Sequence, residues 1–162
     1  MAGVDTKVRG ADKKEAFHRE AESRIAPFGF RRPAENLDSS KAVFYLAHSD
    51  LMIATVQIIT EGGDNNMHYH PGRDSFWMVL KGRLRFHGSD GVIGEYGPNE
   101  GLLMPRNARY WFETADPNQE LHLLHVEANT GKDEVKRVNL MAKKPDHQPN
   151  RRFNYPEGVR DD

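Results

Sequence analysis

Between residues 42 and 127 the chain is a series of short apolar or alternating segments, each of strand length and each bounded by Gly, Pro, Asn or Asp. β-Branched and aromatic residues, which favour strands, are frequent in them. In chain order the segments read AVFYLAH, LMIATVQIIT, MHYH, SFWMVLK, RLRFHG, GVIGEY, GLLMP, ARYWFE and ELHLLHVEA. About eight or nine strands without an intervening helical pattern predict an all-β antiparallel sandwich or barrel rather than a parallel sheet.

The residues before this series predict one short helix. Residues 1–11 are predicted to be disordered, and Asp12 can cap a helix start directly after them. Phe17, Ala21 and Ile25 then recur every four residues as one apolar stripe, before a proline and a glycine end the helix. We expect this helix to pack on the outside of the barrel.

The residues after the series are rich in proline and charge. Phe153 and Tyr155 are the side chains that can anchor this segment to the barrel or to a second subunit. We therefore expect three parts in the chain: residues 1–41 with the helix, a barrel over residues 42–127, and a C-terminal extension over residues 128–162.

Composition excludes several classes of protein. The 162 residues contain 23 Lys and Arg against 24 Asp and Glu, so no large net charge attracts nucleic acid or an anionic membrane. Cysteine is absent, which excludes disulfides and thiolate metal sites and makes a reducing cytoplasm the default. No apolar stretch approaches the roughly 20 residues of a membrane span, and the N-terminus lacks the apolar core of a signal peptide. We expect a soluble cytoplasmic protein whose partner is a small molecule.

Two histidines stand one residue apart in the segment HYHPGRDSFWMVLKG, residues 68–82. Because strand side chains alternate between faces, His68 and His70 point the same way, roughly 7 Å apart along the strand. Two imidazoles at that spacing can converge on one ion. They can equally be solvated or joined in a hydrogen-bond network.

This stretch resembles the first motif of the cupin superfamily: Gly, five residues, His-x-His, three or four residues, Glu, six residues, Gly. Gly62, His68, His70 and Gly82 fall at the motif positions. The resemblance covers roughly residues 42–127 and implies a jelly-roll double-stranded β-barrel. The glutamate position is altered, since it falls on Ser75, with Asp74 beside it as the alternative.

The second cupin motif is kept less closely. Anchored on Pro105, it places Asn107 at a glycine position and Tyr110 at the position of the third histidine. Asn107 suits the glycine position, because asparagine tolerates a left-handed backbone better than other residues with side chains.

Resemblance to metal-dependent cupins implies a divalent transition metal (Fe, Mn, Ni or Zn) held by His68 and His70, with dioxygenase or isomerase chemistry. Tyr110 is then the third ligand or the catalytic proton donor. Asp74 or His122 can complete the shell, because one of the two histidines of ELHLLHV, His122 or His125, must face inward if that strand lines the barrel; otherwise both are surface or hydrogen-bonded histidines.

Two alternatives stay open. In a metal-free enzyme of the epimerase type, a histidine and Tyr110 act as base and acid, with Asp74 or Glu113 orienting the histidine. In a non-catalytic binding or sensing module, His68 and His70 are only the polar lining of a pocket.

A homodimer is the oligomeric state that we expect. Trp77, Trp111 and Tyr69 would make an adhesive surface if they lie on the outward face of the barrel. Pairing of two barrels through their sheets would cover that surface.

Overall fold

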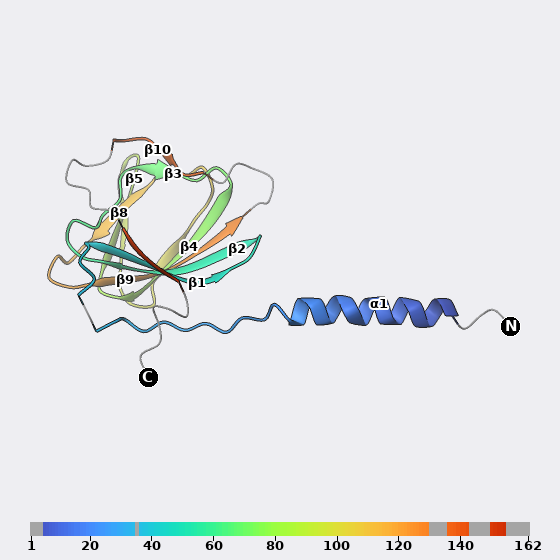
Figure 1. Cartoon of the computed structure of the whole chain (residues 1–162). Coiled ribbons are helices and arrows are strands. Elements are labelled where there is room, and N and C mark those ends of the chain that lie inside the picture. Colours follow the sequence, from blue (N-terminus) through green and yellow to red (C-terminus); the bar gives the residue numbers. More distant parts are fainter. Residues whose placement is uncertain (1–4, 35, 130–135, 143–149, 155–162) are drawn as a thin grey trace.

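The computed structural model describes residues 5–34, 36–129, 136–142 and 150–154. It contains a β-barrel and one helix, α1 (Asp5–Glu22), that projects away from the barrel (Figure 1). The strands are β1 (Lys41–His48), β2 (Met52–Ile59), β3 (His68–Tyr69), β4 (Arg73–Lys81), β5 (Leu84–Gly88), β6 (Gly91–Tyr96), β7 (Gly101–Met104), β8 (Trp111–Thr114), β9 (Leu121–Asn129), β10 (Val138–Asn139) and β11 (Arg151–Asn154). The predicted all-β jelly-roll class is confirmed.

Three sheets make the barrel. The largest has six strands in the order β11-β1-β2-β9-β4-β7, and the second has three in the order β6-β5-β8. The third is the pair β10-β3, which lies at one end of the barrel (Figure 1). All described pairings are antiparallel except that of β11 with β1. The C-terminal extension therefore adds a strand to the largest sheet and another to the smallest.

The helix differs from its prediction in extent and in packing. It starts at Asp5 rather than Asp12, so the predicted disorder is wrong from residue 5 onward; no proline between the two residues stops the helix. Its expected packing on the barrel is wrong, since the Phe17 side chain is 66% exposed and Ile25 lies beyond the helix end. An apolar stripe this short buries too little surface to hold a helix against a sheet. None of the described helical segments is long and apolar enough to span a membrane.

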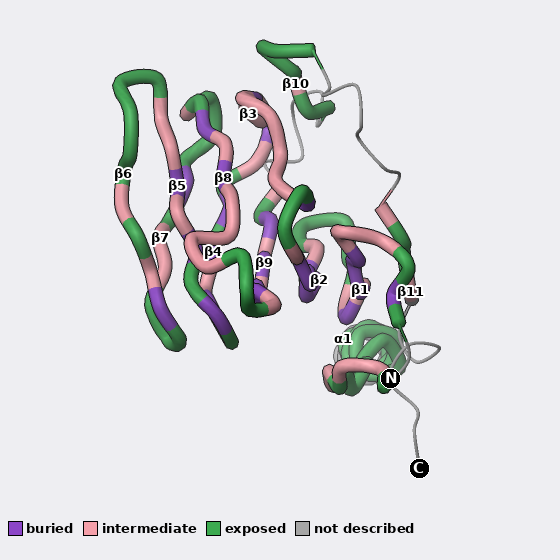
Figure 2. Tube along the Cα trace, turned by 90° about the vertical axis from the view of Figure 1, so that its left-hand side faces the viewer, coloured by how far each residue is buried: buried purple, intermediate pink, exposed green. Residues whose placement is uncertain are grey.

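Alternation along the strands divides the barrel into an interior and an outer layer. The buried positions of the strands lie inside the barrel, and the exposed positions are concentrated on β6 and at the strand ends (Figure 2). The interior has two halves. One half is a core of apolar and aromatic residues: Ile59, Trp77, Val79, Leu84, Phe86, Met104, Tyr110, Phe112, Leu121 and Leu123. The other half carries the polar side chains of the same strands.

A second apolar cluster lies on the outer face of β1 and β2. Leu37 and Phe30 of the segment before β1 cover this face, and Phe153 of β11 packs there too. Phe153 stacks on Phe44 with ring centroids 4.6 Å apart and planes at 6°. Phe153 is thus an anchor of the extension on the barrel, whereas Tyr155 lies outside the described residues.

Trp77 lies inside the barrel, where its side chain is only 2% exposed. The expectation that it faces outward is wrong, because Trp77 shares a strand face with Ser75 and that face is the interior one. The exposed apolar residues of β4 and β7 are Phe76, Leu80 and Leu103.

Gly82 occupies its motif position for a steric reason. Its φ is +83°, and a Cβ atom there would lie 2.6 Å from the carbonyl oxygen of Glu120. Neither the left-handed backbone nor this approach tolerates a side chain. The glycine lets the β4–β5 connection pass close to the start of β9.

Phe153→Ala should lower the free energy of unfolding by about 1–3 kcal/mol, because it removes the stacked ring that anchors β11. Chemical denaturation followed by fluorescence measures the change. Phe28→Ala is the matched control, since the Phe28 side chain is 58% exposed and should contribute less than about 0.5 kcal/mol. Equal stability of the two variants would show that the extension contributes nothing to the folded barrel.

Candidate functional site

A cavity of about 340 Å³ lies where the polar part of the barrel interior meets the apolar core, so that Trp77, Tyr110 and Phe112 of the core also line it. His68 of β3, His70 just after it and Tyr110 just before β8 all line this cavity. The three side chains that the sequence singles out therefore meet in one place. They come from the two motif segments, which are about 40 residues apart in the chain.

Backbone hydrogen bonds hold the two motif segments together. His68 and Tyr110 form an antiparallel bridge in which each N–H donates to the other's carbonyl oxygen at 3.0 Å. The Asn107 N–H donates to the His70 carbonyl at 3.0 Å, and Asn107 has a φ of 67°. The left-handed backbone predicted for Asn107 is confirmed, and it lets the turn after Pro105 reach back to His70.

The three rings are close neighbours. The centroids of His68 and His70 lie 5.1 Å apart with the planes at 85°, and that of Tyr110 lies 4.4 Å from His68 and 6.4 Å from His70. His68 Nδ1 lies 2.8 Å from the Asn66 carbonyl oxygen. A carbonyl only accepts hydrogen bonds, so Nδ1 carries the proton and Nε2 keeps its lone pair.

Burial and neighbouring cations keep both imidazoles neutral. Burial lowers the pKa of His68 to about 3, with a further contribution from Arg137, and the pKa of His70 to about 4, with a contribution from Arg73. Burial also raises the pKa of the Tyr110 phenol. Near pH 7 the site thus presents two uncharged imidazoles and an un-ionised hydroxyl.

Of the two histidines in β9, His125 faces the cavity and His122 does not. The His125 ring stacks on Trp77 with centroids 3.6 Å apart. His122 lies on the outer side of the sheet, with Nε2 at 3.0 Å from Glu120 Oε2 and its ring against Phe30. His122 therefore lies on the face of β9 that points away from the cavity, and it cannot complete the site.

The carboxylates considered from the sequence are also outside the cavity. Asp74 is exposed, and its Oδ1 accepts the backbone N–H of Arg106 at 2.8 Å. Glu113 accepts a hydrogen bond from His87 Nε2 at 2.9 Å on the three-stranded sheet β6-β5-β8. Ser75, at the family's glutamate position, is the buried neighbour, with 1% exposure. Neither Asp74 nor Glu113 orients His68 or His70.

Four basic residues in the cavity wall were not singled out from the sequence: Lys41, Arg73, Arg137 and Arg152. Lys41 is in phase with the inward residues Val43 and Tyr45 of β1, and this phase is the signal that could have identified it. Arg137 and Arg152 belong to the C-terminal extension, which carries no strand pattern that would place them.

Polar atoms without partners gather around the cavity. Among the described residues, eight buried side-chain nitrogen or oxygen atoms have no hydrogen-bond partner, and seven of them belong to residues of the cavity wall. The seven are Thr55 Oγ1, Gln57 Oε1, His70 Nδ1, Arg73 Nε, Trp77 Nε1, Tyr110 Oη and His125 Nε2. Each such atom costs roughly 1–3 kcal/mol unless something in the cavity satisfies it.

The donor set does not complete a metal centre. Over the ranges that the structure describes, no three His, Asp or Glu side chains are grouped so that they could hold an ion. His68 and His70 provide two nitrogen ligands, and the Tyr110 phenol would have to lose a proton that its surroundings hold tightly. Functional sites usually supply three protein ligands.

Comparison with known proteins identifies the barrel. The profile of the family described as "Cupin domain" matches residues 55–127. No curated protein matches the sequence significantly.

Several solved structures share the fold. A conserved protein with a double-stranded β-helix domain from Klebsiella pneumoniae aligns with a TM-score of 0.57 and 17% identity, over 74% of this chain and 93% of its own. The Cnp3 cupin domain of Schizosaccharomyces pombe gives 0.54 and 15%, over 62% and 73%. A cupin family protein from Methanocaldococcus jannaschii gives 0.54 and 17%, over 67% and 94%.

The double-stranded barrel, the motif glycines and histidines at their family positions, and the profile match agree with one another. Residues 55–127 match the cupin domain family, and the chain has the double-stranded β-barrel fold of these solved structures.

Proposed function

We propose that this cupin binds a small polar molecule in its barrel cavity, in contact with His68, His70 and Tyr110. The observation that carries the proposal is the set of unpartnered polar atoms around the cavity. A core that needed only stability would place apolar side chains at these positions, because buried polar atoms without partners are costly. A bound molecule with both hydrogen-bond donors and acceptors would satisfy them.

The site residues also support proton transfer on the bound molecule. A neutral imidazole can accept a proton, and an un-ionised phenol can donate one. Reactions of the isomerase or epimerase type need such a pair on either side of the reacting carbon. The same residues would serve in binding alone if the molecule carried no acidic hydrogen.

Tyr110→Phe separates a binding role from a structural one. The phenyl ring keeps its packing, while the loss of an unpartnered hydroxyl should leave the free energy of unfolding unchanged or raise it by about 1 kcal/mol. Affinity for a small molecule that binds in the cavity should fall about tenfold. Denaturant titration gives the stability, and calorimetric titration with hits from a screen of small acids, polyols and sugars gives the affinity.

Tyr96→Phe is the matched control for this variant. Tyr96 packs against Phe86, with ring centroids 6.3 Å apart, and is not part of the cavity wall. Its loss of a hydroxyl should leave affinity unchanged. The proposal fails if the screen yields no molecule that protects the protein against unfolding, or if Tyr110→Phe binds every hit as tightly as the parent chain.

The neutral histidines predict loss of stability in mild acid. The pKa values of His68 and His70 lie below the ordinary value of 6.5, so the unfolded chain binds more protons between about pH 6.5 and pH 4. The stability is complete above pH 6.5 and is lost as the pH falls through this window. Each histidine should contribute about 2 kcal/mol of the loss between pH 7 and pH 5.

Urea titrations at the two pH values measure this loss. In His70→Gln the loss should be smaller than in the parent chain, whereas His48→Gln, at an exposed position, should show the full loss. The same loss in all three proteins would mean that His70 is protonated equally in the folded and unfolded chains.

A divalent transition metal on His68, His70 and Tyr110 is the second candidate. One observation favours it: the Asn66 carbonyl fixes the His68 tautomer so that Nε2 is free to donate its lone pair. A bound Fe, Mn, Ni or Zn ion would polarise a carbonyl or activate oxygen, and the dioxygenase class would then apply. The incomplete donor set makes this the weaker of the two candidates.

Elemental analysis of protein purified without a histidine tag compares the two candidates. The donor set predicts far less than one ion per chain, because two nitrogen ligands bind weakly. Near-stoichiometric metal that disappears in His68→Ala would establish the metal centre instead. His48→Ala controls for adventitious binding to surface imidazole.

The homodimer also stays a proposal. Its support now comes from the exposed residues Phe76, Leu80 and Leu103 on the outer face of β4 and β7 rather than from Trp77.

A further inference from the structure

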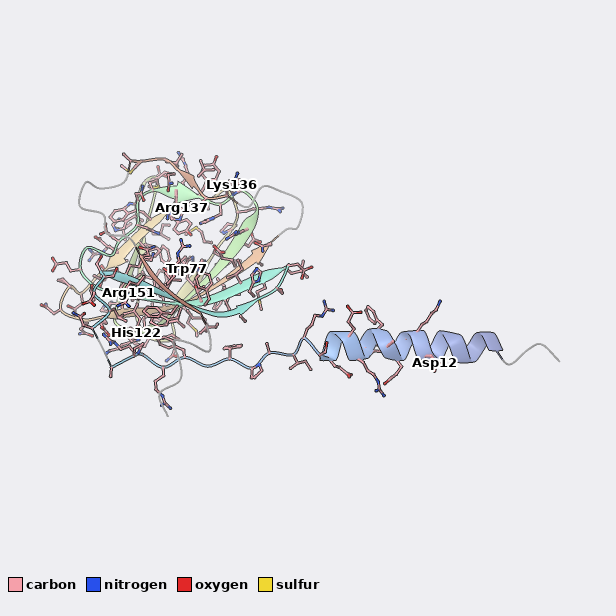
Figure 3. The ribbon with its side chains drawn as sticks, in the orientation of Figure 1. Asp12, Trp77, His122, Lys136, Arg137 and Arg151 are labelled. Atoms are coloured by element: carbon pink, nitrogen blue, oxygen red, sulfur yellow. The ribbon has the colours of Figure 1, made fainter. Side chains whose placement is uncertain are left out.

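Two described strands of the C-terminal extension, β10 and β11, lie beside strands of the cavity wall, and residues of the extension contribute side chains to that wall. β10 pairs with β3, and β11 pairs with β1, so both flank strands that carry cavity residues. Arg137, directly before β10, lies at the end of the barrel where β3 and β10 meet (Figure 3). Arg137 and Arg152 of the extension both line the cavity.

A hydrogen bond positions the Arg137 side chain, and strand pairing positions the backbone of Arg152. Arg137 Nη2 donates to the Asn66 side-chain oxygen at 3.0 Å, and Asn66 is the residue whose carbonyl fixes His68. Arg152 is the register partner of Val43, which faces the cavity from β1.

Lys41 adds a third positive group from the start of β1. Its Nζ lies over the Phe112 ring, 5.0 Å from the centroid. Burial and the Arg137 charge together lower the pKa of Lys41 to about 7, against the opposing effect of Asp64. The Lys41 amine is therefore only partly protonated near pH 7, and an anion beside it would favour the charged form. An ammonium group in such a place is stabilised by a nearby negative charge.

The charges of the cavity wall are unequal. Among the described residues, the wall contains four basic residues and one acidic residue, Glu127. Glu127 is already paired with Arg73, so it does not balance Lys41, Arg137 or Arg152. Both motif histidines are neutral, and the Glu127 carboxylate does not offset the remaining positive charge of the wall.

We propose that the cavity recognises an anionic group, a carboxylate or a phosphate, placed between Lys41, Arg137 and Arg152. This inference rests on the proposed binding function and adds the chemical class of the ligand. The anionic end of the molecule lies toward the extension, and its remaining polar atoms meet His68, His70 and Tyr110. The cavity volume equals that of about eleven water molecules at ~30 Å³ each, which fits a small organic acid.

Charge-matched probes test the inference. Malonate and inorganic phosphate are titrated calorimetrically into the full chain, with malonamide as the uncharged analogue of malonate. We expect malonate to bind at least tenfold more tightly than malonamide, because charge-assisted hydrogen bonds are roughly twice as strong as neutral ones.

Lys41→Met keeps an unbranched side chain of similar length but removes the amine that lies over Phe112, and it should weaken malonate binding about tenfold or more. Lys81→Met, at an exposed position outside the cavity, is the matched control and should bind as the parent chain does. Arg152→Gln gives an independent measurement, because Arg152 is largely exposed and its loss should not disturb folding.

Three results would overturn the inference. Malonamide could bind as tightly as malonate, both Lys41→Met and Arg152→Gln could bind malonate like the parent chain, or neither malonate nor phosphate could bind at millimolar concentration. If only the preference for anions is wrong, the screen still yields neutral molecules that bind in the cavity, and their affinity still falls in Tyr110→Phe. If the proposed function itself fails, no small molecule of any charge binds in the cavity.

Discussion

The structure depends on a constraint of closed sheets: every second residue of a strand must enter the barrel. Inside, a side chain has no access to bulk water, so its polarity must match what surrounds it. In this chain the interior changes from apolar to polar along the same strands. On β9, Leu121 and Leu123 belong to the core, and His125 and Glu127 line the cavity. The polar half is therefore the part of the fold that stability alone does not explain.

Much of the fold could be predicted, because its determinants are local in the sequence. Strand length, alternation and turn residues identify the segments, and Gly82 sits where the backbone admits no side chain. The pairing of His68 with His70 also follows from alternation alone. Their meeting with Tyr110 depended on the resemblance to the cupin motifs, since nothing local in the sequence joins segments so far apart.

The predictions that the structure contradicts concern which face of a strand points inward, and that face depends on pairing between distant segments of the chain. Deciding between His122 and His125 requires knowing which face of β9 is inward, and both faces of that segment are rich in leucine. Trp77 was misplaced for the same reason. The cationic residues of the extension were missed because β10 and β11 are short, and they are strands only through their partners in the barrel.

The two short strands of the extension have a consequence for how the domain is delimited. The family profile ends at residue 127, before either strand begins. A fragment cut at that limit would leave β1 as an unprotected edge with free amides and carbonyls, which invites intermolecular pairing. It would also lose the Arg137 and Arg152 guanidinium groups from the cavity wall. We therefore expect the folding unit to extend past residue 127, as the wall of the cavity does.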